Sequence, residues 1–166
     1  MPLIENGNII EDSFVRVSDE DALPEGAAVL VSADRFLKEA ETLKARSAPV
    51  GVIWPNNRPI AEIEPYLGQL ALIALVFPIF RDGRAYSQAR LLRERHGWTG
   101  PIRATGNVLR DQFLLMERSG FDQIEAVKPA DAAAFDEAVH RYTVFYQPAT
   151  DQRPSLLRQR LGRVAP

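Results

Sequence analysis

The chain contains no cysteine among its 166 residues. Cysteine thiolates hold iron–sulfur clusters and carry out thiol–disulfide exchange, so the chain by itself performs neither kind of chemistry. Its two histidines, His96 and His140, lie far apart and lack metal-ligand spacing with carboxylates. We therefore predict no metal site.

Three further kinds of signal are missing. No Gly-x-Gly-x-x-Gly or Gly-x-x-x-x-Gly-Lys pattern occurs, which argues against a bound nucleotide cofactor, and no Gly-x-Ser-x-Gly elbow indicates a serine hydrolase. Together with the missing cysteines, these absences predict a protein without a cofactor. The formal net charge of −2 argues against nucleic acid as a partner, because such binders usually carry a basic excess.

Membrane signals are absent as well. No apolar run reaches the roughly 18 residues that a membrane-spanning helix needs. The first residues, Met-Pro-Leu-Ile-Glu, have neither the basic start nor the apolar stretch of a signal peptide. We expect a cytoplasmic protein with no membrane partner.

The pattern of apolar residues predicts one α/β domain over residues 1–150. Asn6-Gly7 between apolar flanks indicates a small β-hairpin within residues 1–18. Beyond it, short apolar runs alternate with helix-period segments, which predicts about five parallel strands with right-handed crossovers. The expected strands are residues 27–31, 50–54, 72–77, 102–104 and 123–127. An open three-layer sheet and a partial barrel fit this pattern equally well.

Residues 151–166 form a tail that contains Arg153, Arg158, Arg160 and Arg163 beside two prolines. A terminal segment without apolar periodicity buries little surface. We expect it to be mobile or ordered by a partner.

Two strand-to-helix junctions carry the charged residues of most interest. In the first, Arg81 and Arg84 are placed to bind an oxyanion such as sulfite, sulfate or phosphate, with Ser87 adding a hydroxyl at the start of the helix. A structural turn, in which Asp82 pairs with one arginine and Gly83 adopts a positive φ, explains the same residues at least as well.

The second junction repeats this arrangement. Arg103 ends a strand, Asn107 is placed to cap the next helix, and Arg110 follows in its first turn. Because carboxyl ends of parallel strands meet at one edge, we expect Arg81, Arg84 and Arg110 to share a crevice. Asp111 is either an orienting partner for an arginine or an acid near the positive helix end. Asp82 and Asp111 are only weak candidates for a catalytic base.

The segments FRDGRAYSQARLLRERHG and GPIRATGNVLRDQFLLMERSGFD resemble the bacterial domain-of-unknown-function family nine-three-four. Its members are often labelled oxidoreductases of sulfite reduction, a label that rests largely on gene neighbourhood with sulfite reductase. The resemblance therefore implies a pathway more than a reaction. This chain has Asn107 where the family usually has aspartate and Ser119 where cysteine is frequent. It thus offers neither an acid at the first position nor a thiol at the second.

These observations lead to an expected function. The resemblance implies an accessory protein of assimilatory sulfur metabolism whose partner is a sulfite reductase component. Without cysteine, the chain cannot itself be the catalytic subunit of a conventional sulfite reductase. Its arginine-lined crevice would bind a small oxyanion or an acidic partner surface. The alternatives are an enzyme for a phosphorylated or sulfonated small molecule, with Asp82 or Asp111 moving a proton, and a structural interaction module.

Overall fold

A computed structural model describes residues 1–151 and 153–162. Its strands form one mixed sheet of eight strands in the order β2-β1-β8-β7-β6-β5-β4-β3. The neighbours β3 to β8 run parallel, and β1 is antiparallel to both β2 and β8. The strands are β1 (Leu3–Glu5), β2 (Asn8–Ile10), β3 (Phe14–Arg16), β4 (Ala28–Ser32), β5 (Val50–Trp54), β6 (Leu72–Phe77), β7 (Ile102–Gly106) and β8 (Gln123–Glu125).

The α/β class is confirmed, but the expectation of five parallel strands is wrong by one, because β3 adds a sixth parallel strand. The predicted hairpin is present. β1 and β2 pair around a turn in which Asn6 has φ 49° and Gly7 has φ 76°, as the favoured two-residue hairpin turn requires.

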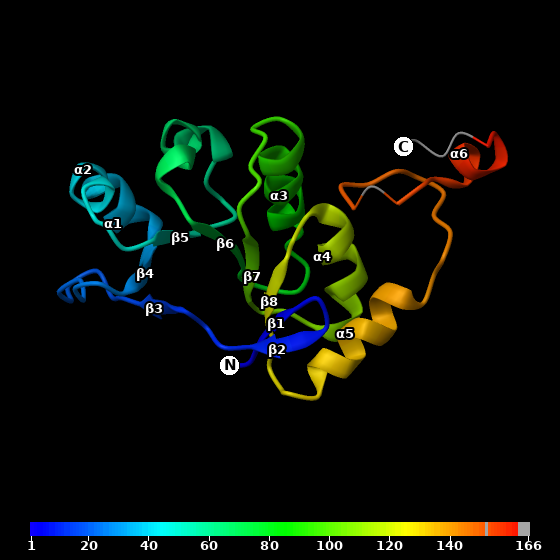
Figure 1. Cartoon of the computed structure of the whole chain (residues 1–166), viewed down its shortest axis with the longest axis horizontal. Helices are drawn as coiled ribbons and strands as arrows, with labels where there is room; N and C mark the ends of the chain where they lie inside the picture. Colours follow the sequence, from blue (N-terminus) through cyan, green and yellow to red (C-terminus); the bar gives the residue numbers. More distant parts are fainter. Residues whose placement is uncertain (152, 163–166) are drawn as a thin grey trace.

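The sheet curls into a half-barrel with its helices on the outside (Figure 1). Strands β3 to β8 follow one another in sheet order, and right-handed crossovers then place every connecting helix on the same face. An open three-layer sheet would need the strand order to reverse. The helices are α1 (Ala33–Lys38), α2 (Ala40–Lys44), η1 (Ile60–Glu62), η2 (Glu64–Gln69), α3 (Arg84–Glu94), η3 (Arg110–Gln112), α4 (Phe113–Ser119), α5 (Asp131–His140) and α6 (Leu156–Arg160).

The main core lies between the convex face of the sheet and these helices. Alternate residues of each strand point there, for example Val52 and Trp54 of β5 and Ile73 and Leu75 of β6, all fully buried. The intervening residues face the concave side, where Leu30, Leu72 and Ala74 form a second, smaller cluster. Burial on both faces explains why the strands read as continuous apolar runs in the sequence.

The first part of the predicted tail, residues 153–156, packs against the domain, whereas residues 157–162 are exposed. The Arg153 guanidinium donates to both carboxylate oxygens of Glu117, at 2.8 and 2.9 Å, and to the carbonyl of Val139. The Arg118 guanidinium lies 3.8 Å from the centre of the Phe145 ring, and the Leu156 amide donates to the Phe145 carbonyl. These contacts contradict the expectation of a mobile tail for residues 153–156, whereas residues 152 and 163–166, Arg163 included, lie outside the described residues.

Gly106, at the end of β7, generates a prediction about stability. It has φ +95°, and a Cβ added there would lie 2.6 Å from the Phe77 carbonyl oxygen of the neighbouring strand. Gly26 has φ +70° but nothing within 4 Å of such a Cβ. We expect Gly26→Ala to lower the free energy of unfolding by about 1–2 kcal/mol, and Gly106→Ala by at least about twice as much because overpacking adds to the strain. Urea unfolding measures the free energy of unfolding of both variants. Equal losses of stability would show that the added Cβ at position 106 does not clash with Phe77.

Candidate functional site

The loop between β6 and α3 forms an exposed hollow at the carboxyl edge of the sheet. It brings together four of the residues singled out in the sequence, Arg81, Asp82, Arg84 and Ser87, and is completed by Ile79 and Gly83. The first junction therefore does form a surface of its own, from the loop after β6 and the first turn of α3.

Within this hollow, Arg84 is engaged by Asp82. Arg84 Nε donates to Asp82 Oδ1 at 2.9 Å, and Nη2 donates to Oδ2 at 2.6 Å. These hydrogen bonds from Arg84 are the main reason that the pKa of Asp82 lies far below its usual range. Because so weak a base is a poor proton acceptor at neutral pH, the geometry does not favour Asp82 as a general base.

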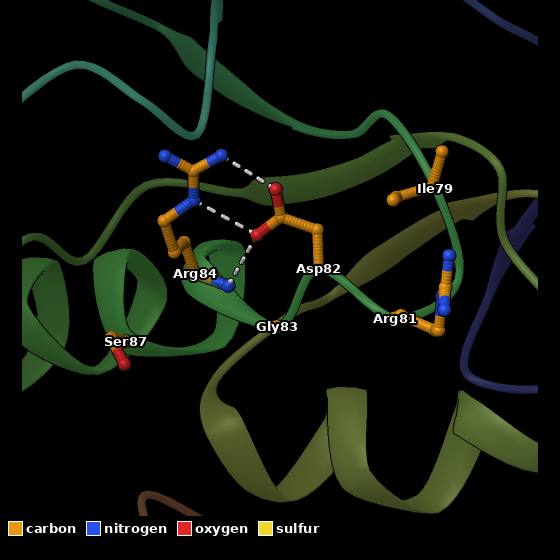
Figure 2. A pocket seen from close by; sticks show the side chains of 6 residues that line it. All are labelled: Ile79, Arg81, Asp82, Gly83, Arg84 and Ser87. Atoms are coloured by element: carbon orange, nitrogen blue, oxygen red, sulfur yellow. Dashed lines mark hydrogen bonds and ion pairs between the residues drawn. The ribbon is translucent and has the colours of Figure 1, made fainter.

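Arg81 is arranged differently. Its exposed side chain makes no ion pair with any residue that the structure describes. Figure 2 shows it pointing away from the Arg84–Asp82 pair, with Ser87 directed elsewhere again. The two arginines thus do not converge on one point. Arg81 instead follows directly on Ile79 and Phe80, whose side chains are 51% and 46% exposed.

The second junction contributes to other hollows. Arg110 Nε donates to Asp131 Oδ1 at 2.6 Å, and Arg110 lines hollows on the α5 side of the molecule, one of them shared with Asp111. Asn107 does not cap a helix. Its backbone N–H donates to the Phe77 carbonyl at 2.7 Å, and η3 begins after Leu109. The two junctions are adjacent, but the hollow that holds Arg81 and Arg84 is not lined by Arg110.

Each of the loops that follow β6, β7 and β8 carries exposed apolar side chains. Ile79 and Phe80 belong to the first loop, Leu109 to the second and Val127 to the third, and each is more than two-fifths exposed. Arg81, Arg110 and Lys128 stand beside them in the sequence and are also exposed. We call this set the carboxyl-edge surface. Exposed apolar groups bordered by cations are typical of protein-docking sites.

Arg103 is not at this edge. Its neighbours Ile102 and Ala104 face the helices, so strand alternation turns Arg103 to the concave face, where it is 1% exposed. Its two terminal nitrogens each donate to an Asp12 oxygen at 2.8 Å. Asp12 lies in the link between β2 and β3, so this link reaches across the concave face to β7.

The polar group that surrounds Arg103 was not predicted from the sequence. Glu125 of β8 is 8% exposed and accepts hydrogen bonds from Arg16 of β3 and from the Thr105 hydroxyl of β7. One signal for it exists in the sequence. Arg103 and Thr105, and likewise Gln123 and Glu125, are polar residues at alternate positions of apolar strands, which indicates a polar sheet face.

Asp12 and Tyr86 also have shifted pKa values. Burial by itself raises the pKa of Asp12, but the hydrogen bonds from Arg103 and the Phe14 amide, with the charges of Arg103 and Arg16, lower it overall. Burial, assisted by the charge of Asp111, raises the pKa of the Tyr86 phenol to about 12. Asp12 is therefore charged, and Tyr86 neutral, at any physiological pH.

Comparisons with known proteins give one match. The family model described as "Bacterial protein of unknown function (DUF934)" matches residues 51–157. No curated protein matches the chain. No solved structure matches it either. Within the described residues, no cluster of three or more histidine or acidic side chains could hold a metal ion, and no helix is long and apolar enough to cross a membrane.

The Asp12–Arg103 pair generates a prediction about pH. Removing one partner of a buried pair leaves an uncompensated charge. We expect Asp12→Asn to lower the free energy of unfolding by about 3 kcal/mol at pH 7, the low end of the range for buried pairs, because Asp12 is partly exposed. Since the folded state has the lower pKa, this contribution is complete above the ordinary carboxyl pKa near 4 and disappears as the pH falls through the folded value.

The measurement is urea unfolding of wild type and variant between pH 7 and pH 2. Asp21→Asn, a change in an exposed loop, is the matched control and is expected to alter stability by less than about 0.5 kcal/mol. A difference between wild type and Asp12→Asn that stays constant down to pH 2 would contradict the assignment.

Proposed function

The chain belongs to the bacterial DUF934 family, and we propose that it is an accessory protein of sulfite reduction that binds an acidic surface of a partner protein. The family resemblance supplies the pathway and suggests a sulfite reductase component as the partner. The carboxyl-edge surface supplies the mode of binding. A cytoplasmic location is part of the same proposal.

The observation that carries the proposal is the contrast between Arg81 and Arg84. Arg84 is neutralised by Asp82, whereas Arg81 has no ion pair among the described residues and follows two exposed apolar side chains, Ile79 and Phe80. Arginine beside apolar groups is a frequent combination in binding hot spots. A partner with a carboxylate next to an apolar patch satisfies both features of this loop.

The same contrast makes a small oxyanion a weaker candidate for the ligand. Strong oxyanion binding needs several donors that converge on one point. Of the two arginines in this hollow, only Arg81 has no ion pair among the described residues, and the Asp82 carboxylate next to Arg84 repels a second negative charge. For a phosphorylated or sulfonated substrate the same repulsion applies, and Asp82 is too weak a base to move its proton at neutral pH.

We expect Arg81→Ala to weaken binding to the purified sulfite reductase component of the same bacterium by at least about tenfold, which corresponds to about 1.4 kcal/mol. Arg90→Ala is the matched control, because Arg90 is an exposed arginine of α3 already paired with Glu94. Both variants should keep the wild-type melting temperature within a few degrees. Isothermal titration at low and high salt measures the affinities, and equal affinities for the two variants would refute the proposal.

A second titration separates the oxyanion alternative. Asp82→Asn removes the carboxylate that neutralises Arg84. If the site serves a small oxyanion, sulfite or sulfate should bind wild type measurably and this variant more tightly. We expect no saturable binding of either anion to wild type at millimolar concentration. Saturable binding to wild type, together with no binding of the partner protein, would establish the oxyanion function instead.

A further inference from the structure

The concave face of the half-barrel contains a small hollow that is separate from the carboxyl-edge surface. It has a volume of about 170 Å³ and is lined by Met1, Leu3, Asp12, Arg16 and Glu125. Arg16 belongs to β3, Leu3 to β1 and Glu125 to β8, so the two ends of the sheet and the link between β2 and β3 meet at this point. The carboxyl-terminal mouth is where barrels of parallel strands place their ligand sites.

The charged groups that line this hollow, and Arg103 that contacts them, are costly to the fold. Arg103 is 1% exposed and Glu125 is 8% exposed, and the desolvation of such groups costs several kcal/mol each. Apolar residues of similar volume often replace a buried ion pair with no loss of stability. The Asp12–Arg103 pair fixes the link between β2 and β3 on β7, but this role does not explain why the exposed Arg16 stands beside Glu125 at the hollow. A ligand that binds Arg16 does.

Arg16 has unused capacity for a ligand. Its side chain is 55% exposed, and within the described residues its hydrogen bonds come only from Nη2, which donates to Glu125 and, at 3.4 Å, to Thr105. The remaining nitrogens of the guanidinium are able to hold a carboxylate, whose two oxygens match its planar geometry.

Two carboxylates lie beside Arg16. Asp12 is 40% exposed on its side chain, and Glu125 contributes a second carboxylate to the lining. The two carboxylates are balanced by two arginines, Arg16 and the buried Arg103, so the hollow carries no net positive charge that would draw in a dianion such as sulfate or phosphate. The exposed part of the Asp12 side chain can still accept from a positive group that is only a few atoms away from the carboxylate held by Arg16. The lining therefore matches a ligand that carries both charges.

The size of the hollow sets the size of the ligand. Its volume of about 170 Å³ corresponds to about five or six water molecules at their share of roughly 30 Å³ each in the liquid. It is smaller than the roughly 300 Å³ at which pockets for drug-sized ligands begin. A molecule of five or six heavy atoms fills it, which is the size of the smallest α-amino acids.

We propose that this concave hollow binds a small zwitterion of the α-amino acid type, with its carboxylate on Arg16 and its ammonium group on Asp12 and Glu125. The site is distinct from the carboxyl-edge surface, and the inference does not depend on the proposed docking function.

The first experiment uses wild-type protein and a panel of probes. Glycine and alanine carry both charges, acetate carries only the negative one, methylamine carries only the positive one, and sulfate is a dianion. We expect glycine or alanine to bind saturably in isothermal titration, at least tenfold more tightly than acetate or methylamine, and sulfate not to bind. Absence of saturable zwitterion binding at millimolar concentration, or equal binding of acetate, would overturn the proposal.

The second experiment locates the site. Arg16→Gln should weaken glycine binding at least tenfold, whereas Arg90→Gln, a matched change on the outer surface of α3, should leave it unchanged. Circular dichroism confirms that both variants are folded. Amide chemical shifts of the wild type provide a test that needs no variant, because glycine should perturb Leu3, Arg16 and Glu125. Perturbations confined to the loop of residues 78–83, or unchanged affinity of Arg16→Gln, would place the ligand elsewhere and refute this site.

Discussion

The order of the strands determines how this protein can fold. Because β3 to β8 follow one another in the sheet, right-handed crossovers leave helices on the convex face only. The concave face then has no helical layer to cover it. The link between β2 and β3 crosses it instead, and Phe14 at the start of the edge strand β3 packs against Leu30, Leu72 and Ala74.

Because no helix covers the concave face, polar contacts rather than apolar packing hold the link between β2 and β3 in place. The link has few apolar side chains, and its contact with β7 is the ion pair between Asp12 and Arg103. Arg103 is enclosed on all sides, and its charge is tolerated because Asp12 accepts two hydrogen bonds, Gln123 accepts a third and the Glu125 carboxylate lies 3.5 Å away. The position of the link therefore depends on one charged pair rather than on a packed apolar interface.

The sequence predicted the parts of the fold that bury long apolar runs. Strands β4 to β8, the Asn6-Gly7 hairpin and the helices α3 and α4, which Gly97 and Gly120 follow, have local signals. β3 was missed because its three residues, Phe-Val-Arg, are too few to show a period, whereas the equally short β8 lies within a longer strand-like run, residues 123–127. The curl of the sheet follows from strand order, which alternation alone does not reveal. Arg81, Arg84 and Ser87 were predicted to share a hollow. The direction in which each arginine points depends on whether a carboxylate pairs with it, and the sequence does not show which arginine Asp82 pairs with.

The arginines of this chain show how burial separates two roles. Arg103 is buried and must be paired, because an isolated charge inside the protein costs several kcal/mol. Arg81 is exposed, where water solvates the charge and an ion pair would contribute only about 0–1 kcal/mol. An unpaired arginine at the surface therefore costs the fold nothing and remains free for a partner, especially beside Ile79 and Phe80, whose exposure has no benefit for folding. Arg16 lies between these cases, since it is held by Glu125 at one nitrogen and open at the others. Glu125 fixes the position of the Arg16 side chain, while its other guanidinium nitrogens have hydrogen-bond donors left over. We expect this arrangement of a side chain that binds a small ligand.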